Sequence, residues 1–211
     1  SQLLNDSPLK NKNTKKNIIF TNDTLFKILV NNIYIYFEKI LKSIFLHSPR
    51  ETFTLNFFGS DITKLKEYKN ADIIHIHWLS EGFIRLSSLS KIDKPVVWTL
   101  RDMWAFTGGA HYTMDFKKYE KSYLSKLIQN FKKKNYNKNF HFIAISDWLK
   151  NKAKKSNVLK EYDVKRIYNN IDLKDFISIP KDDAKLFLGI STKKQIILYG
   201  AQNPQSKRKG W

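Results

Sequence analysis

The sequence contains no cysteine, so disulfide bonds, thiolate nucleophiles and cysteine metal ligands are excluded. Acidic residues are scarce: 19 Asp and Glu stand against 38 Lys and Arg, and the formal net charge is +19. This excess indicates an anionic partner, such as nucleic acid, anionic lipid or a phosphorylated substrate. The alternative is a general bias in composition, because the lysines are scattered over most of the chain.

A long uninterrupted apolar run is also missing. The most apolar stretch, 25–46, is interrupted by three lysines and by Glu38, whereas a transmembrane helix needs about 20 apolar residues with few charges. We therefore expect no transmembrane span, and the polar, basic residues 1–16 lack the features of a secretory signal. Apolar residues in 24–45 recur every three or four positions, which predicts a helix packed on the core, with an interfacial membrane helix as the alternative.

The most informative stretch is 71–112. Two short apolar runs within it, 73–77 and 96–100, are rich in β-branched residues and predict buried strands. A helix-compatible segment, 81–90, lies between them, so the three form a βαβ unit with parallel neighbouring strands. Polar, ionisable and glycine residues follow both strands, at the sheet edge where open α/β folds bind ligands.

The same alternation continues along the chain. Helices are predicted at 61–66 as a short turn, at 116–138, at 147–156 after the N-cap Ser146, and at 182–188. Further strands are predicted at 52–57, 140–145, 164–168 and 195–199. This order predicts an α/β fold with a mainly parallel sheet.

Five runs carry a resemblance to a known family. They are DIIHIHW from residue 72, KPVVWTLRDMWAFTGGAHY from 94, FIAISDWLKNKAKKS from 142, NNID from 169, and ILYGAQNP from 197 followed by RKG. In this order they resemble the bacterial family-four glycosyltransferases of polysaccharide biosynthesis, including colanic-acid-type enzymes and enzymes of lipopolysaccharide assembly. The resemblance implies a GT-B architecture, in which two Rossmann-like domains hold a nucleotide sugar between them. It also implies retaining transfer of a sugar, of the hexosyltransferase type, from an NDP-sugar to a glycan or lipid-linked acceptor.

The chain departs from the family in several places. No Gly-rich loop is found near the N-terminus, and Ala110 and Phe116 stand where relatives often have cysteine. Arg101 stands where many relatives have histidine, and Asn169-Asn170 replaces the usual Asn-Gly pair. The carboxylates that hold the donor sugar in the family lie beyond Trp211. We therefore expect a chain truncated at both ends and inactive by itself.

Candidate residues for the acceptor side gather at the strand ends. Arg101 and Asp102 are the expected catalytic pair: a guanidinium can clamp a phosphate or hydroxyl, and a carboxylate can orient it or accept a proton. The alternative is a local Arg–Asp pair that holds the loop. His75 is expected to make a structural hydrogen bond. The expected substrate contacts are His77, Gly108, Gly109, His111 and Tyr112.

The donor diphosphate needs cations and backbone N–H groups to stabilise its charge. The resemblance assigns this role to Gly200, Arg208 and Lys209, while an exposed basic tail is the alternative for the last two. The donor is a substrate, so no cofactor is expected, and no metal site is expected because His75 and His77 lack further ligands nearby.

Three regions are expected: a loop or disordered terminus at 1–23, an incomplete acceptor-side Rossmann-like domain at 24–178, and a linker with the first strand of a donor-binding domain at 179–211. A cytoplasmic location is expected, with peripheral contact to an anionic membrane and no specific nucleic-acid binding. Two other functions stay open: a non-catalytic remnant, or a basic protein that binds nucleic acid or membrane surfaces.

Overall fold

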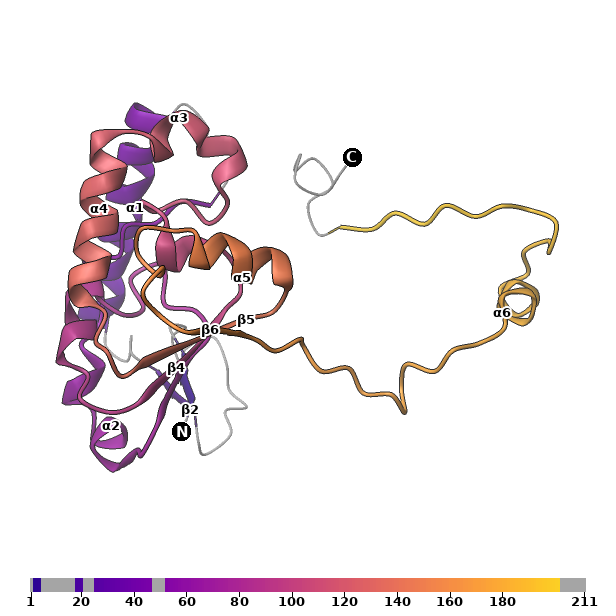
Figure 1. Cartoon of the computed structure of the whole chain (residues 1–211), viewed down its shortest axis with the longest axis horizontal. Helices are drawn as coiled ribbons and strands as arrows, with labels where there is room; N and C mark the ends of the chain where they lie inside the picture. Colours follow the sequence, from indigo (N-terminus) through magenta and orange to yellow (C-terminus); the bar gives the residue numbers. More distant parts are fainter. Residues whose placement is uncertain (1, 5–17, 21–24, 47–51, 202–211) are drawn as a thin grey trace. The chain divides into compact units, whose positions relative to one another are not determined.

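The computed structural model describes residues 2–4, 18–20, 25–46 and 52–201. Its centre is a four-stranded parallel sheet whose strands lie side by side in chain order (Figure 1). The strands are β3 (Ile74–Ile76), β4 (Val96–Leu100), β5 (Phe140–Ala144) and β6 (Val164–Arg166). The predicted α/β class is confirmed, as is the parallel pairing of β3 with β4. The arrangement is that of a Rossmann-like domain.

The strand register aligns the carboxyl ends of three strands at one edge of the sheet. Leu100 pairs with Ala144, and Ala144 pairs with Arg166, so β4, β5 and β6 end in one line. β6 stops at Arg166, two residues before the predicted end at 168. The residues that follow these strands therefore share one edge, which positions the candidate site.

The helix predicted between β3 and β4 is not an α-helix. The structure has a turn and then a 3₁₀ helix, η3 (Leu86–Lys91). Glu81 and Gly82 have φ of 57° and 75°, and such left-handed backbone cannot continue a right-handed helix.

The predicted strand at 52–57 is reduced to one isolated bridge. Phe53 bridges Ala110 in antiparallel fashion, and the N–H of Thr54 donates to the carbonyl of Gly109 at 3.0 Å. Asn56 has a φ of 56°, which ends any extended run. Its side chain donates instead to the carbonyls of Leu79 and Ile84.

The remaining helices of the first unit follow the predictions more closely. Ser122 and Ser146 accept backbone N–H bonds as N-caps, and Asp61 accepts one from Thr63. The predicted helix at 116–138 divides at its Ser122 cap. The helices are η2 (Ile62–Lys64), α2 (Lys66–Asn70), η5 (Thr113–Phe116), α3 (Lys117–Glu120), α4 (Tyr123–Asn135) and α5 (Asp147–Lys154).

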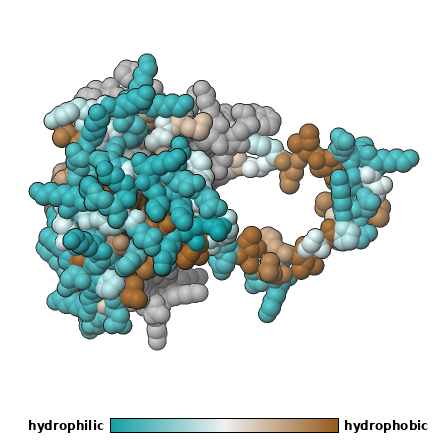
Figure 2. Space-filling view, in the orientation of Figure 1, coloured by the Kyte–Doolittle hydropathy of each residue, from teal (hydrophilic) through white to brown (hydrophobic). Residues whose placement is uncertain are grey.

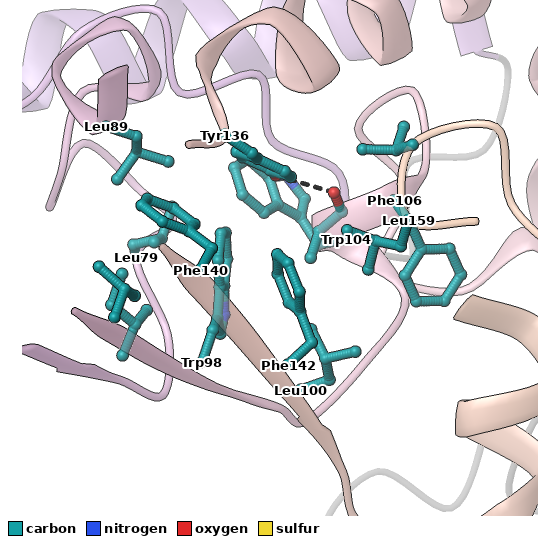
Figure 3. Close-up of a cluster of buried hydrophobic side chains, with 14 of the residues drawn as sticks. Leu79, Leu89, Trp98, Leu100, Trp104, Phe106, Tyr136, Phe140, Phe142 and Leu159 are labelled. Atoms are coloured by element: carbon teal, nitrogen blue, oxygen red, sulfur yellow. Dashed lines mark hydrogen bonds between the residues drawn. The ribbon is translucent and has the colours of Figure 1, made fainter. Parts of the chain in front are cut away.

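The core is rich in aromatic rings (Figure 3). Trp98 of β4 packs on Phe142 of β5 at 5.7 Å between centroids, and on Tyr136 at 5.3 Å. The Tyr136 hydroxyl donates to the carbonyl of Ala105 at 2.8 Å. This contact fixes η4 (Trp104–Phe106), the short helix directly after the β4 edge.

Helix α1 (Leu25–Leu46) confirms the predicted helix, but its expected packing is wrong. Several apolar residues expected in the core are exposed, for example Phe26 at 74% and Ile33 at 61%. The helix buries Tyr34 and Glu38 instead. The Glu38 carboxylate accepts the N–H groups of Leu55 and Asn56, so polar contacts hold this helix to the domain.

Two other expectations differ from the structure at the chain's ends. The loop expected over 1–22 contains β1 (Gln2–Leu4) and β2 (Ile18–Phe20), which pair in parallel. The strand expected at 195–199 is absent from the described residues, because no neighbouring strand pairs with it and Ile197 is 97% exposed.

The chain divides into two compact units, 1–168 and 169–211. The second unit contains helix α6 (Lys181–Phe187), as predicted, and Gly189 follows its C-cap with a φ of 68°. Figure 2 shows apolar side chains on the surface of the extended segments before and after α6. The predicted boundary at 178 stays a prediction.

Candidate functional site

A shallow pocket lies at the carboxyl ends of β3 and β4. His77 follows β3 directly, and Arg101 and Asp102 follow β4. The structure therefore brings together three of the predicted residues at the expected sheet edge. The pocket is lined by His77, Trp78, Leu79, Ser80, Trp98, Leu100, Arg101, Asp102, Trp104 and Ala105.

His77 and Arg101 face each other at the pocket, with Arg101 Nη2 3.5 Å from His77 Nδ1. The ring of His75 lies against His77, 4.1 Å between centroids. Partial burial lowers the pKa of His77, and the charges of His75 and Arg101 lower it further. These effects favour the neutral imidazole of His77, with Nδ1 accepting from Arg101 and Nε2–H left to donate. His75 binds Thr99 Oγ1 at 2.9 Å, which confirms its predicted structural hydrogen bond.

Asp102 is held rigidly at the pocket wall. One carboxylate oxygen accepts the N–H of Trp104 at 2.9 Å, and the other lies 2.7 Å from Nδ1 of His111. On the far side, His111 Nε2 lies 3.1 Å from Thr54 Oγ1. With Nδ1–H donating to Asp102, the imidazole orients the carboxylate from behind.

The other predicted substrate contacts are not among the described residues that line this pocket. The His111 side chain is only 5% exposed and contacts the Asp102 carboxylate from inside the domain. Gly108 and Gly109 are buried, and a Cβ on Gly109 would lie 2.7 Å from the ring of Phe53. These glycines therefore permit close packing of the loop on the domain itself. Tyr112 packs partly buried against the hydrophobic core.

Behind the pocket lie two charged side chains that the sequence did not single out. Lys132 of α4 is fully buried, donates to the carbonyl of Trp104, and lies 3.6 Å from the centroid of that indole. Burial lowers the pKa of Lys132 to about 7, while Glu120 and Asp102 act in the opposite direction.

Glu120 holds the glycine loop. It accepts the N–H of Gly108 at 3.3 Å and the side chains of Ser125 and Gln129. Burial raises the pKa of the Glu120 carboxyl, although these hydrogen bonds counteract it. Lys132 lies in a lysine-rich helical segment, where nothing in the sequence distinguishes a buried lysine from the exposed ones. Neither Lys132 nor Glu120 could therefore be identified from the sequence pattern.

The predicted donor contacts are not part of this pocket as described. Gly200 belongs to the second unit. A Cβ atom added to Gly200 would lie in open space, with no neighbouring atom within 4 Å. Arg208 and Lys209 lie outside the described residues. Within the described residues, no group of three or more His, Asp or Glu side chains can hold a metal ion, and no helix is long and apolar enough to cross a membrane.

Comparison with known proteins gives one family match. The model of the family described as Glycosyltransferase Family 4 matches residues 30–175, which is more than half of the chain. The matched region contains most of α1, the whole four-stranded sheet and the pocket residues. No curated protein and no solved structure matches the chain.

Proposed function

The chain belongs to glycosyltransferase family 4, and from this premise we propose that it transfers a sugar from an NDP-sugar to a glycan or lipid-linked acceptor. The proposal includes retention of configuration, a hexose as the transferred sugar, and a place in bacterial surface polysaccharide biosynthesis, including the colanic-acid type. The observation that carries it is the pocket at the β3–β4 edge, where Arg101, His77 and Asp102 meet.

The chemistry of the pocket fits an acceptor hydroxyl. A neutral His77 whose Nδ1 accepts from Arg101 can donate its Nε2–H to the hydroxyl oxygen, and Asp102 is fixed in place by His111 and the Trp104 N–H. The Arg101 guanidinium can clamp a phosphate or an acceptor hydroxyl through its paired N–H donors.

The donor side belongs to the second unit in this proposal. Gly200, Arg208 and Lys209 would contact the diphosphate, with cations and backbone N–H groups neutralising its charge and without a metal ion.

Peripheral membrane contact is the second part of the proposal. Helix α1 exposes an apolar stripe that includes Phe26, Ile33 and Phe37, and the chain carries a net charge of +19. An amphipathic helix on a strongly basic chain is suited to the interface of an anionic bilayer. We place the protein in the cytoplasm, on the inner face of the membrane that carries a lipid-linked acceptor.

The test is a transfer assay with the product of the complete gene. Purified protein is mixed with a panel of UDP-, GDP- and dTDP-sugars and with lipid-linked acceptors, and released nucleoside diphosphate is measured. Acceptor-dependent release with one donor supports the proposal. The absence of release with every donor, from folded protein, favours the non-catalytic remnant. Retention of the protein on DNA that disappears at moderate salt identifies bulk charge only.

A further inference from the structure

A second group of side chains at the same sheet edge has no role in the pocket described above. It lies at the ends of β5 and β6 and consists of Asp147, Trp148, Arg166 and Tyr168. We propose that this group, the β5–β6 cluster, binds a neutral saccharide unit of the acceptor, one or two sugar rings away from the transfer point. The inference rests on the proposed function, because it extends the acceptor side of that site.

The cluster combines aromatic faces with paired polar groups. Arg166 Nε lies 3.2 Å from Asp147 Oδ1, and the Tyr168 hydroxyl donates to the other carboxylate oxygen at 3.3 Å. The guanidinium also lies over the ring of Tyr168, 4.3 Å from its centroid. Donor and acceptor atoms are therefore fixed next to each other, as a sugar with neighbouring hydroxyl groups requires.

The aromatic rings of the cluster are at least half exposed. Trp148 is 51% exposed and Tyr168 is 61% exposed. The electron-rich face of an aromatic ring attracts the weakly positive C–H groups of a sugar ring. Stability does not account for the cluster, because the Asp147 side chain is 64% exposed and an ion pair of this kind contributes little to folding.

The charge balance identifies the ligand class. Asp147 neutralises Arg166 within the cluster, whereas a phosphate site needs uncompensated positive charge. A neutral polyhydroxylated ligand fits this balance better than a nucleotide or a phosphorylated lipid.

The position along the edge fits a continuous acceptor. Leu100, Ala144 and Arg166 are in register on β4, β5 and β6, and neighbouring strands lie about 4.8 Å apart. Arg101 and the β5–β6 cluster are therefore separated by two strand spacings, about 10 Å. That length corresponds to one or two sugar rings, so one oligosaccharide can reach both places.

Saturation-transfer NMR on the 211-residue chain tests the inference. The probes are neutral trisaccharides of glucose, galactose and N-acetylglucosamine at millimolar concentration, without donor. We expect at least one trisaccharide to bind, and Trp148→Ala and Tyr168→Ala to weaken binding about three- to tenfold each, as for a lost aromatic contact. Tyr123→Ala, at a tyrosine that is 76% exposed at the start of α4, is the matched control and should bind normally.

Three outcomes overturn the inference: no trisaccharide binds, all variants bind equally well, or pyrophosphate binds in place of sugar and Arg166→Ala removes it. Circular dichroism of each variant establishes that it is folded. Because no donor and no turnover are involved, failure of the transfer assay leaves this result unaffected. Conversely, a complete enzyme that transfers sugar while the variants bind sugar normally overturns this inference alone.

Discussion

Arg101 is the residue on which the proposed chemistry depends most. Its side chain is exposed at the end of β4, beside a neutral His77. In the complete enzyme we expect Arg101→Ala to lower kcat by about 30- to 1,000-fold, because a charge-assisted contact made in the transition state contributes about 2–4 kcal/mol. Steady-state kinetics measure the loss, and thermal unfolding is the control for stability. A near-normal rate would assign Arg101 and Asp102 to a structural role in the loop.

Lys132 gives a prediction about pH. Burial lowers its pKa to about 7 in the folded protein, whereas an unfolded lysine titrates near its usual value of about 10.4. Between these two values the unfolded state binds more protons, so stability rises with pH by at most about 1.4 kcal/mol per unit. The cost of burying the charge is therefore complete below about pH 7 and is relieved as the pH rises through this window.

Chemical denaturation of the wild type and of Lys132→Met, at steps from neutral to alkaline pH, checks this. The other titrating groups are common to both proteins, so their effects largely cancel. We expect the wild type to gain stability relative to the variant as the pH rises. A difference that stays constant with pH would show that Lys132 keeps an ordinary pKa in the folded state.

The elements show which parts of this fold depend on local sequence and which on distant contacts. The strands β3, β4 and β5 were predictable, because their short β-branched and aromatic runs need a buried sheet. The α5 cap was predictable from Ser146 alone. The turn at Glu81 and Gly82 was not, because it depends on Asn56, more than 20 residues away, whose side chain binds the carbonyls of Leu79 and Ile84.

The candidate site divides in the same way. The place of His77 and Arg101 follows from the strand ends and from the rule for parallel sheets. The orientation of Asp102 does not, because it depends on His111 and Thr54, which come from separate loops. Periodicity also could not show which face of α1 is buried, since Glu38 anchors the helix through backbone N–H groups that no pattern reveals.

The next prediction concerns membrane binding through the exposed apolar side chains of helix α1. Replacing Ile33 and Phe37 together by serine should weaken binding to anionic vesicles by at least about tenfold, because each buried apolar side chain contributes about 1.5–3 kcal/mol. These side chains are 61% and 51% exposed in the domain, so the free energy of unfolding should change little. Vesicle sedimentation at low and high salt measures the binding.

The matched control for α1 is Phe187→Ser, at an apolar residue that is 90% exposed on α6. It should leave vesicle binding unchanged. Equal partitioning of wild type and double variant, or equal binding to neutral and anionic vesicles at every salt concentration, would argue against membrane contact through α1.

At the scale of the whole molecule, the two units differ in how well they bury their apolar residues. The first contains the aromatic core and the sheet. In the second, residues such as Leu173, Phe187 and Leu198 are more than three-quarters exposed. A nucleotide sugar bound by this second unit would keep contacts to its charged diphosphate, but little of its surface would be buried.

We therefore expect the 211-residue chain to show no measurable sugar transfer and to bind nucleoside diphosphate only weakly, through phosphate charge. Isothermal titration with UDP and with uridine, over a range of salt concentrations, separates charge from base recognition. UDP binding should decline steeply with salt because screening weakens the attraction between exposed charges, and uridine should not bind. Salt-independent UDP binding, or turnover by this chain, would mean that the 211 residues already form a donor site, and this expectation would then be wrong.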